Sequence, residues 1–384
     1  MLDAPAEQIV DSTPMLGAAA TQDTVRLVRS GVKKLIDAVE AVDEGAGGGL
    51  ADGLEFDYAR PNEKPDCRWR EKRERERMLT RVAEDAERAL RAVERAAGLL
   101  AEEAVRDAHA LLRELVGQDF DVDDDGVPRL HRGTRQDRIL STVDPEMRHG
   151  RKSRHQRFDG YKLHAAATNT AEPLITAVEV APANEQDGPH AAALVERQPE
   201  RLRPGLLLGD TAYGTGPVRA ELAEREVEVL APVPEAPVRE GRLAKRDFHI
   251  DVGAGTVTCP TAQVAKIRTQ RSGARAAIFS RAACRDCPLR ARCLGPHTTH
   301  KSLQLAPEEE LLIAARQALD DPDTAEHLRR GRPRIERLLG LLTHRYGARK
   351  ARYIGAAKAR LQALWAAALV NLNPIARHLA AATT

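Results

Sequence analysis

The sequence predicts an α/β fold in which helices flank a mixed sheet, and two patterns along the chain support this prediction. Residues 159–169 and 174–181 have the composition of two strands joined by a short turn, which is typical of a β-hairpin. Residues 205–210, 216–225 and 227–233 then read as a strand, a helix and a strand. Elements that alternate in this order are typical of an α/β core.

The N-terminal third predicts one strand followed by a helical insertion. Residues 5–16 read as a short strand that ends in a polar turn, with Asp11 at its end. Apolar residues from Val25 to Val42 recur at three- and four-residue steps, which predicts an amphipathic helix. The glycine-rich residues 45–53 predict a flexible connection. The pattern of residues 69–116 predicts a long antiparallel helical pair that ends at Gly117.

An acidic segment follows this helical pair. Asp121, Asp123, Asp125 and Gly126 have the spacing of a calcium-binding loop, but its twelfth position holds Arg132 instead of glutamate. We therefore interpret the segment as an ordinary Asp-rich turn.

The C-terminal half predicts a small cysteine-bearing β insert and then helices. Residues 248–293 contain one hairpin and a loop with cysteines, and helices are expected from Pro333 to about Leu379, with interruptions near Gly347 and Pro374. The predicted organisation is a core formed by residues 1–24, 138–240 and 301–384, a helical insertion at 25–137 and a cysteine-bearing insert at 241–300.

Composition excludes several classes of protein. The chain contains no apolar run long enough to span a bilayer, and its N-terminus has no secretion signal. Five cysteines in 384 residues do not indicate a disulfide scaffold, so a reducing, cytoplasmic environment is expected.

Positive charge is concentrated although the net charge is only +2. Residues 329–360 contain eleven Lys or Arg and one acid, Glu336, and residues 148–162 are also basic. Such strips are typical of proteins that bind a polyanion such as DNA, although a solvated Arg-rich face remains an alternative.

Three carboxylates are candidates for metal chemistry. Asp11 and Asp210 each follow an apolar strand, and Glu336 stands alone among positive charges. Phosphodiester transfer can use two divalent ions held by carboxylates that converge from separate elements. From spacing alone, each aspartate could equally be a turn or helix-capping residue.

Several long strings resemble the DDE transposases of bacterial insertion sequences, most closely the group typified by insertion sequence eleven eighty-two. The strings lie in the same order along essentially the whole chain: IVDSTPMLGAAATQDTVRLVRSGVKKLI (9–36), VDPEMRHGRKSRHQRFDGYKLHAA (143–166), LITAVEVAPANEQDG (174–188), LLGDTAYGTGPVRAEL (207–222), CRDCPLRARC (284–293), RPRIERLLGLL (332–342) and RYIGAAKARLQALWAAALVNLNP (352–374).

The resemblance implies an RNase H-like fold and a catalytic triad. The first acid lies in a V-D-S-T context, here Asp11. The second lies in a G-D-x-x-Y context, here Asp210 with Tyr213, and the third in an R-x-x-x-E arrangement, here Arg332 with Glu336. In the family these acids bind two Mg²⁺ (or Mn²⁺) ions, cleave transposon ends and join the freed 3′-hydroxyl to target DNA.

The chain departs from the broader superfamily at two positions. Relatives often carry a Tyr seven residues before the Glu and a Lys seven residues after it, whereas this chain has Arg329 and Thr343. Pro333 suits the first turn of a helix, which predicts that Arg329 lies outside the helix.

Double-stranded DNA is the partner that the resemblance implies. Asp144 competes as a catalytic acid because it precedes the basic run, but the family pattern places it outside the triad. We interpret the run as a contact with the DNA backbone, with a basic loop that makes no contact as the alternative. The residues expected to contact DNA are Arg148, Arg151, Lys152, Arg154, Tyr213, Arg332, Arg349, Lys350 and Arg352.

Four cysteines predict a structural zinc site. Cys259, Cys284, Cys287 and Cys293 include one close C-x2-C pair, and four thiolates can hold tetrahedral Zn²⁺ in a small insert. Reduced thiols without metal are the alternative, His297 and His300 are substitute ligands, and Cys67 is expected to be inert.

The first functional hypothesis is an active transposase that acts as a dimer on DNA, in the bacterial cytoplasm and at the nucleoid. Because Asp11 lies so near the start, the resemblance also predicts that the DNA-recognition domain expected ahead of the first strand is missing. The alternatives are a truncated DNA-binding remnant that cannot transpose and a related RNase H-like nuclease or resolvase.

Overall fold

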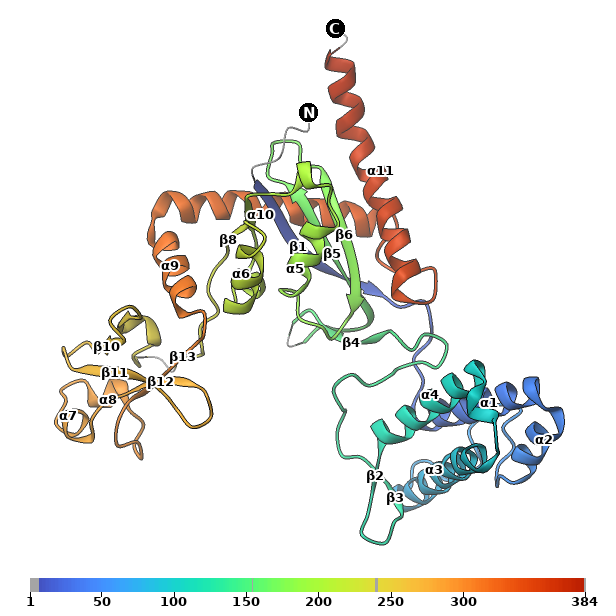
Figure 1. Ribbon diagram of the computed structural model, residues 1–384. Coiled ribbons are helices and arrows are strands. Elements are labelled where there is room, and N and C mark those ends of the chain that lie inside the picture. Colours follow the sequence, from blue (N-terminus) through green and yellow to red (C-terminus); the bar gives the residue numbers. More distant parts are fainter. Residues whose placement is uncertain (1–6, 154, 239–240, 383–384) are drawn as a thin grey trace.

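A six-stranded mixed sheet forms the centre of the molecule (Figure 1). The computed structural model describes residues 7–153, 155–238 and 241–382. Strand β5 is antiparallel to β1 at one edge and to β4 and β6 at the other, and β1, β7 and β8 are parallel. The strands are β1 (Glu7–Leu16), β4 (Arg148–Arg151), β5 (Arg157–Thr168), β6 (Ile175–Pro182), β7 (Leu206–Leu208) and β8 (Glu228–Leu230).

Helices cover both faces of this sheet, so the predicted mixed α/β architecture is confirmed. Helices α5 (His190–Glu196) and α6 (Gly216–Ala223) pack on the face that presents Val10 and Leu207. Helices α10 (Pro322–His344) and α11 (Ala356–Ala382) pack on the face that presents Ile9 and Leu208. Successive residues of a strand point to opposite faces, which explains how neighbours enter different cores.

Two expectations about the C-terminal helices were wrong. Helix α10 begins at Pro322, not at Pro333, because Asp321 caps it by accepting a hydrogen bond from Thr324 N (2.9 Å) and proline suits the first helical position. Pro333 lies on an exposed side within α10, and Pro374 lies within α11 without ending it. Arg329 is therefore a helical residue.

The helical insertion follows β1 and lies apart from the sheet (Figure 1). Helix α1 confirms the stripe from Val25 to Val42, and α3 and α4 confirm the predicted pair, although α4 runs past Gly117. Its elements are α1 (Thr24–Val42), α2 (Glu44–Asp52), α3 (Lys72–Arg95), η1 (Leu99–Ala101), α4 (Glu103–Asp119), β2 (Phe120–Val122) and β3 (Pro128–Leu130). The acidic segment is a turn between β2 and β3, in which Asp123 Oδ1 accepts from Val127 N (2.8 Å).

The glycine-rich segment is helix α2, so the predicted flexible connection was wrong. Asp43 accepts a hydrogen bond from Ala46 N (2.9 Å) and caps this helix. Gly47 packs so closely on Glu40 of α1 that a Cβ atom would lie 2.6 Å from the Glu40 backbone. The glycine permits two helices to approach, a role that local composition does not reveal.

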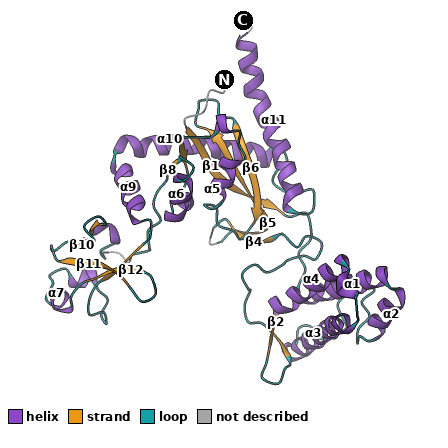
Figure 2. Ribbon diagram, viewed as in Figure 1, coloured by secondary structure: helices purple, strands orange, loops and turns teal. Residues whose placement is uncertain are grey.

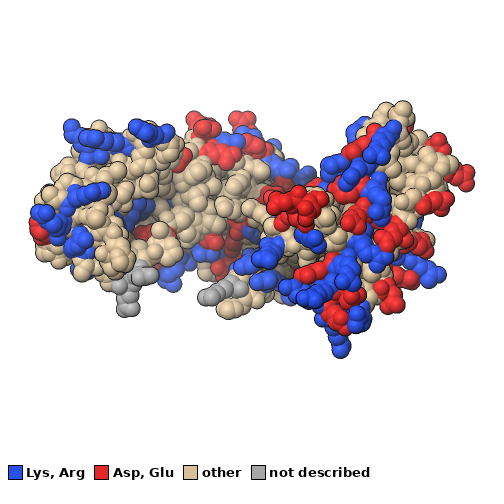
Figure 3. Space-filling model, turned by 90° about the horizontal axis from the view of Figure 1, so that it is seen from below, with Lys and Arg blue, Asp and Glu red and all other residues tan. Residues whose placement is uncertain are grey.

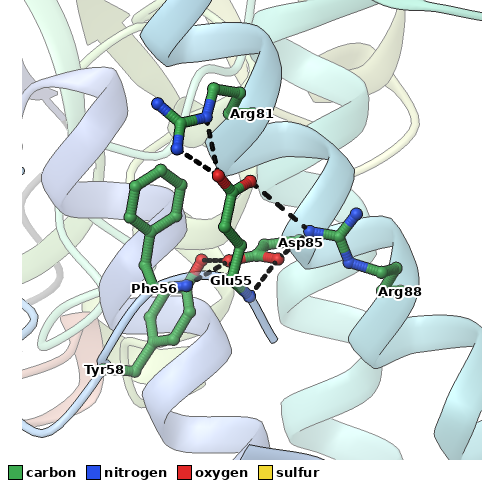
Figure 4. Close-up of polar contacts among 6 residues, drawn as sticks. All are labelled: Glu55, Phe56, Tyr58, Arg81, Asp85 and Arg88. Carbon is green, nitrogen blue, oxygen red and sulfur yellow. Dashed lines mark hydrogen bonds and ion pairs between the residues drawn. The ribbon is translucent and has the colours of Figure 1, made fainter. Parts of the chain in front are cut away.

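A buried carboxylate fastens the segment after α2 to α3 (Figure 4). Asp85 is fully buried and accepts hydrogen bonds from Glu55 N (2.9 Å), Phe56 N (3.0 Å) and the Tyr58 hydroxyl (2.9 Å), and it pairs with Arg88. The insertion thus has its own apolar core and its own polar anchor.

The cysteine-bearing region forms a five-stranded antiparallel sheet, larger than the predicted hairpin. Figure 2 shows it at the opposite end of the molecule from the helical insertion. Its strands are β9 (His249–Asp251), β10 (Thr256–Thr258), β11 (Val264–Thr269), β12 (Arg275–Ile278) and β13 (Ser302–Leu305). This region also contains η4 (Lys245–Asp247), α7 (Arg281–Arg285) and α8 (Arg290–Cys293), and α9 (Glu309–Asp320) follows β13. The short η2 (Glu200–Leu202) and η3 (Thr211–Tyr213) flank β7 of the central sheet.

None of the helices in the described segments combines the length and hydropathy needed to cross a bilayer.

Candidate active site

A cavity of about 510 Å³ lies where β1 passes the end of β7, and all three candidate acids line it. Elements from four distant parts of the chain contribute to its wall. The lining residues are Asp11, Ser12, Thr13, Pro14, Arg151, Lys152, Phe158, Lys162, Asp187, Asp210, Glu336, Leu339, Gly340, Thr343 and His344.

The two aspartates meet because their strands run parallel and in register. Ile9 of β1 lies opposite Leu208, the last residue of β7. Two residues further along each chain, the same register brings Asp11 beside Asp210. Asp11 therefore lies in the middle of β1, opposite Ala165 of β5, and not at the end of a strand as expected.

Asp210 also shapes the turn that follows it. Its side chain accepts a hydrogen bond from Ala212 N (2.8 Å) and caps η3. The capping role that sequence left as the alternative is thus present, and Oδ2 of the same carboxylate has no hydrogen bond to any described residue. One oxygen therefore holds the turn, and the other remains available as a ligand.

Glu336 reaches the cavity from the middle of α10. Ile335, Leu338 and Leu339 are buried against the sheet and fix the orientation of the helix. The Glu336 side chain itself is 59% exposed, and its Oε1 lies 3.9 Å from Nη2 of Arg332 one turn earlier. Glu336 is consequently the acid whose side chain has most freedom to move.

Like charges accumulate around Asp11. The pKa of this carboxyl is raised from 3.8 to about 6, above all by burial, and the carboxylates of Asp210 and Glu336 contribute to this rise. The Ser12 N–H, which donates to Asp11 Oδ1 (2.7 Å), and the Arg332 guanidinium act in the opposite direction. The three acids therefore interact electrostatically, and a cation placed among them would favour the ionised form.

The donor set suits a hard divalent cation, since it consists of carboxylates. In the described segments, however, no three His, Cys, Asp or Glu side chains are arranged closely enough to hold a metal ion. The acids line one cavity with their oxygens still apart.

A basic wall faces these acids, and sequence analysis identified only part of it. Arg151 and Lys152 line the cavity as exposed side chains. Lys162 and Asp187 were not predicted: Lys162 Nζ donates to Asp187 Oδ1 (2.8 Å) and to the Glu185 carbonyl (2.6 Å). The string NEQDG that contains Asp187 was part of the resemblance and was the available signal.

The segment that carries Asp187 packs directly on the turn that carries Asp210. A Cβ atom on Gly188 would lie 2.5 Å from the Ala212 carbonyl oxygen. The close contact between these two backbones fixes Lys162 and Asp187 relative to Asp210.

The remaining residues expected to touch DNA divide into three groups. Arg349, Lys350 and Arg352 are exposed in the segment between α10 and α11, where Leu16 N donates to the Arg349 carbonyl (2.9 Å). Arg148 folds back onto the backbone and donates to the carbonyls of Pro145 and Met147. Arg154 lies outside the described residues.

Tyr213 is placed where it cannot contact DNA. Its side chain is fully buried with Leu207 and Val218, so its expected role as a DNA contact requires correction. The aromatic ring fills the core below Gly209, where a Cβ would lie 2.8 Å from Tyr213 Cβ.

Three further residues complete the account of α10 and its surroundings. Arg329 pairs with Glu326 (2.6 Å) away from the cavity, whereas Thr343 lines it and donates to the Leu339 carbonyl (2.8 Å).

Asp144 is fully buried and accepts from the Tyr161 hydroxyl (2.6 Å), and it is not among the cavity-lining residues.

The thiols of Cys259, Cys284 and Cys287 lie near enough to Cys293 to affect its pKa, although no three of these four described cysteines are arranged closely enough to hold a metal ion. Thr261 Oγ1 lies 3.1 Å from Cys259 Sγ and 3.7 Å from Cys287 Sγ. Burial raises the pKa of the Cys293 thiol; Lys301 lowers it, and the other three thiols raise it. Cys67 is remote and packs against the core of the helical insertion.

The comparisons with known proteins agree with part of this picture. Residues 258–376 match the family model described as a transposase DDE domain, so the chain carries such a domain there. The matched segment contains Glu336, Arg332 and the four clustered cysteines, and it ends within α11. The comparisons with curated proteins and with solved structures found no match.

Proposed function

We propose that this chain is a DDE transposase in which Asp11, Asp210 and Glu336 hold two Mg²⁺ or Mn²⁺ ions. The reaction is DNA cleavage at the ends of an insertion sequence, followed by joining of the 3′-hydroxyl to target DNA. The observation that carries this proposal is that all three acids line one cavity, and that the third lies within the matched transposase domain.

The order of strands supports an RNase H-like core. The sheet runs β6-β5-β1-β7-β8, with two antiparallel pairs followed by two parallel ones. We assign residues 1–24, 138–240 and 301–384 to this core, 25–137 to a helical insertion and 241–300 to the cysteine-bearing insert.

The side chains of the cavity have different roles in the proposed reaction. When bound, the divalent ions supply activation of the attacking oxygen and stabilisation of the leaving oxygen. Asp11 must lose its proton before it can ligate, and the Arg332 guanidinium favours that loss. Glu336, exposed and on a rigid helix, moves to complete the site.

Lys162 orients the scissile phosphate in this proposal. An ammonium has three donor hydrogens, and Asp187 and the Glu185 carbonyl accept two of them. The third can reach a phosphate oxygen, and because the side chain is already held, little ordering is needed on binding. Arg151 and Lys152 contact the flanking backbone, and Arg349, Lys350 and Arg352 extend the DNA path.

A strand-transfer assay tests the proposed activity. Duplexes that end in the inverted repeat flanking the coding sequence are supplied precleaved, with Mg²⁺ and plasmid target. We expect joined product from the wild type and none from Asp210→Ala. A wild type that joins no more DNA than Asp210→Ala contradicts the proposal.

We further propose that Cys259, Cys284, Cys287 and Cys293 bind one structural Zn²⁺. The shared approach of Cys259 and Cys287 to Thr261 and the packing of Cys284 and Cys293 against the core of this sheet support it. Emission spectroscopy of the purified protein should give one zinc per chain, reduced in Cys287→Ser and unchanged in Cys67→Ser. Zinc-free wild type contradicts this site.

A further inference from the structure

The cysteine-bearing sheet is strongly basic. Residues 241–305 contain twelve Lys or Arg and only three Asp or Glu, a net charge of +9, against +2 for the whole protein. By contrast, residues 24–138 contain twenty-two basic and twenty-six acidic side chains. Figure 3 shows the difference: Lys and Arg predominate at the end that carries this sheet, and both signs mix at the helical end.

Strand β11 presents two of these twelve cations on one face. Ala265 is buried and Ile267 half-buried on the inner side, whereas Val264, Lys266 and Arg268 are exposed on the other. Arg271 is exposed in the turn to β12, which is closed by a hydrogen bond from Gln270 N to the Ala274 carbonyl (2.8 Å). We call Lys266, Arg268 and Arg271 the basic sheet face.

The cations of the basic sheet face have no carboxylate partner. Among the described residues, none of the three takes part in an ion pair or a side-chain hydrogen bond. The acid that shares their side of the sheet is Asp251, separated from Lys266 by Thr256. Two strand spacings put it about 10 Å away, and its Oδ1 accepts from Ala254 N (2.8 Å).

Several exposed cations of helix α3, by contrast, are neutralised locally. On α3, Arg77 pairs with Glu74 (3.0 Å) and Arg91 with Glu87 (3.6 Å). Helix α3 is therefore a solvated face of alternating charge, whereas the basic sheet face retains unbalanced positive charge at the end of a flat strand.

We propose that the basic sheet face binds the sugar-phosphate backbone of duplex DNA, as a contact surface separate from the acidic cavity. The negative phosphates of DNA complement the three unpaired cations. When these cations neutralise phosphates, counterions leave the DNA, and their release favours binding. No side chain of this face is needed for base recognition, so the contact positions DNA without reading its sequence. The inference rests on the DNA substrate proposed above, but not on the triad.

The test measures binding of the full-length protein to a random-sequence duplex of about 30 base pairs, between about 50 and about 200 mM salt. The variant is Lys266→Ala/Arg268→Ala/Arg271→Ala. The matched control, Arg73→Ala/Arg75→Ala/Arg95→Ala, removes three exposed cations from α3. Thermal unfolding of both variants checks that they fold like the wild type.

We expect the sheet variant to bind about 10- to 100-fold more weakly and to reduce the slope of log affinity against log salt by about 3. The control should retain the wild-type slope. Equal losses in both variants, or no loss in the sheet variant, overturn the proposal. Tighter wild-type binding to duplex RNA of the same length overturns the choice of DNA.

The strand-transfer assay of the wild type against Asp210→Ala, run beside this titration, separates the two proposals. If the wild type joins no more DNA than Asp210→Ala while the sheet variant still loses affinity, the triad proposal falls and the contact surface stands. If the wild type joins DNA and the sheet variant binds the duplex normally, the triad proposal stands and the contact surface falls.

Discussion

At the scale of single residues, Asp11 carries the most informative chemistry. It occupies a half-buried position in the middle of β1, and it stands near two other acids. Placing a carboxylate there reduces stability in the absence of a counter-ion. We interpret this cost as a consequence of the site's function.

Asp11→Asn is expected to stabilise the metal-free protein above neutral pH. The folded pKa of about 6 exceeds the ordinary 3.8, so the wild type loses stability as pH rises from about 4 through about 6. The neutral amide escapes that loss. Urea unfolding in EDTA should show the variant more stable by about 1–3 kcal/mol at pH 8, and nearly equal to wild type at pH 4.

Exposed Asp124→Asn serves as the control for that measurement and should show no such pH-dependent gap. A difference between Asp11→Asn and wild type that is the same at both pH values would show that burial of charge is not its cause.

Single residues also mark the limit of sequence analysis. The V-D-S-T and G-D-x-x-Y strings singled out Asp11 and Asp210, which line the same cavity, because both acids belong to local motifs. Lys162 and Asp187 could not be paired from sequence, because their contact depends on how β5 and the segment before α5 meet in space. Tyr213 was expected to contact DNA because it belongs to a motif next to Asp210, but its side chain is buried in the core, where it packs beneath the turn.

At the scale of elements, local signals were reliable where they came from periodicity and unreliable where they came from single residues. The stripe of α1 and the β5–β6 hairpin were predicted because burial of one face imposes a period on the sequence. Pro333 did not mark the start of a helix, and the glycines of α2 did not form a flexible connection, because packing against neighbouring elements overrides local preference. The stronger start signal for α10 was the Asp321-Pro322 pair.

Asp85→Ala should destabilise the helical insertion by about 3 kcal/mol. The change leaves the Glu55 and Phe56 amides and the Tyr58 hydroxyl without their shared acceptor, and Arg88 without its buried partner. Tyr58→Phe removes only one of these bonds and should cost about 1 kcal/mol. Chemical denaturation monitored by circular dichroism measures both.

The surface substitution Asp107→Ala on neighbouring α4 provides the reference for these values, with an expected change within about 0.5 kcal/mol. If Asp85→Ala proves as mild as Asp107→Ala, the polar anchor does not hold the segment after α2 in place.

At the scale of the whole molecule, a mixed sheet sits between two additions of different character. The helical insertion has its own core and nearly balanced charge, while the cysteine-bearing sheet is strongly basic. The sequence predicted a helical segment and a cysteine-bearing β segment in this order. The extent of the second was underestimated because four of its five strands have only three or four residues and are separated by loops that obscure the alternation.

Convergence of the acids is likewise a property of the whole chain. Asp11 and Glu336 are 325 positions apart, and only the docking of α10 on the sheet brings them to one cavity. The family resemblance, not the spacing, suggested that these acids act together, and Glu336 is the acid whose position depends most on tertiary packing.

The most direct test of the proposed catalytic triad therefore compares the rates of strand transfer by the variants Glu336→Gln and Glu326→Gln. Both residues are glutamates on α10, but Glu326 pairs with Arg329 and Arg330 outside the cavity. We predict that Glu336→Gln lowers joining in Mg²⁺ by about a thousandfold or more, while Glu326→Gln stays within about twofold of wild type. Equal rates for the two variants would contradict a catalytic role for Glu336, and with it the triad.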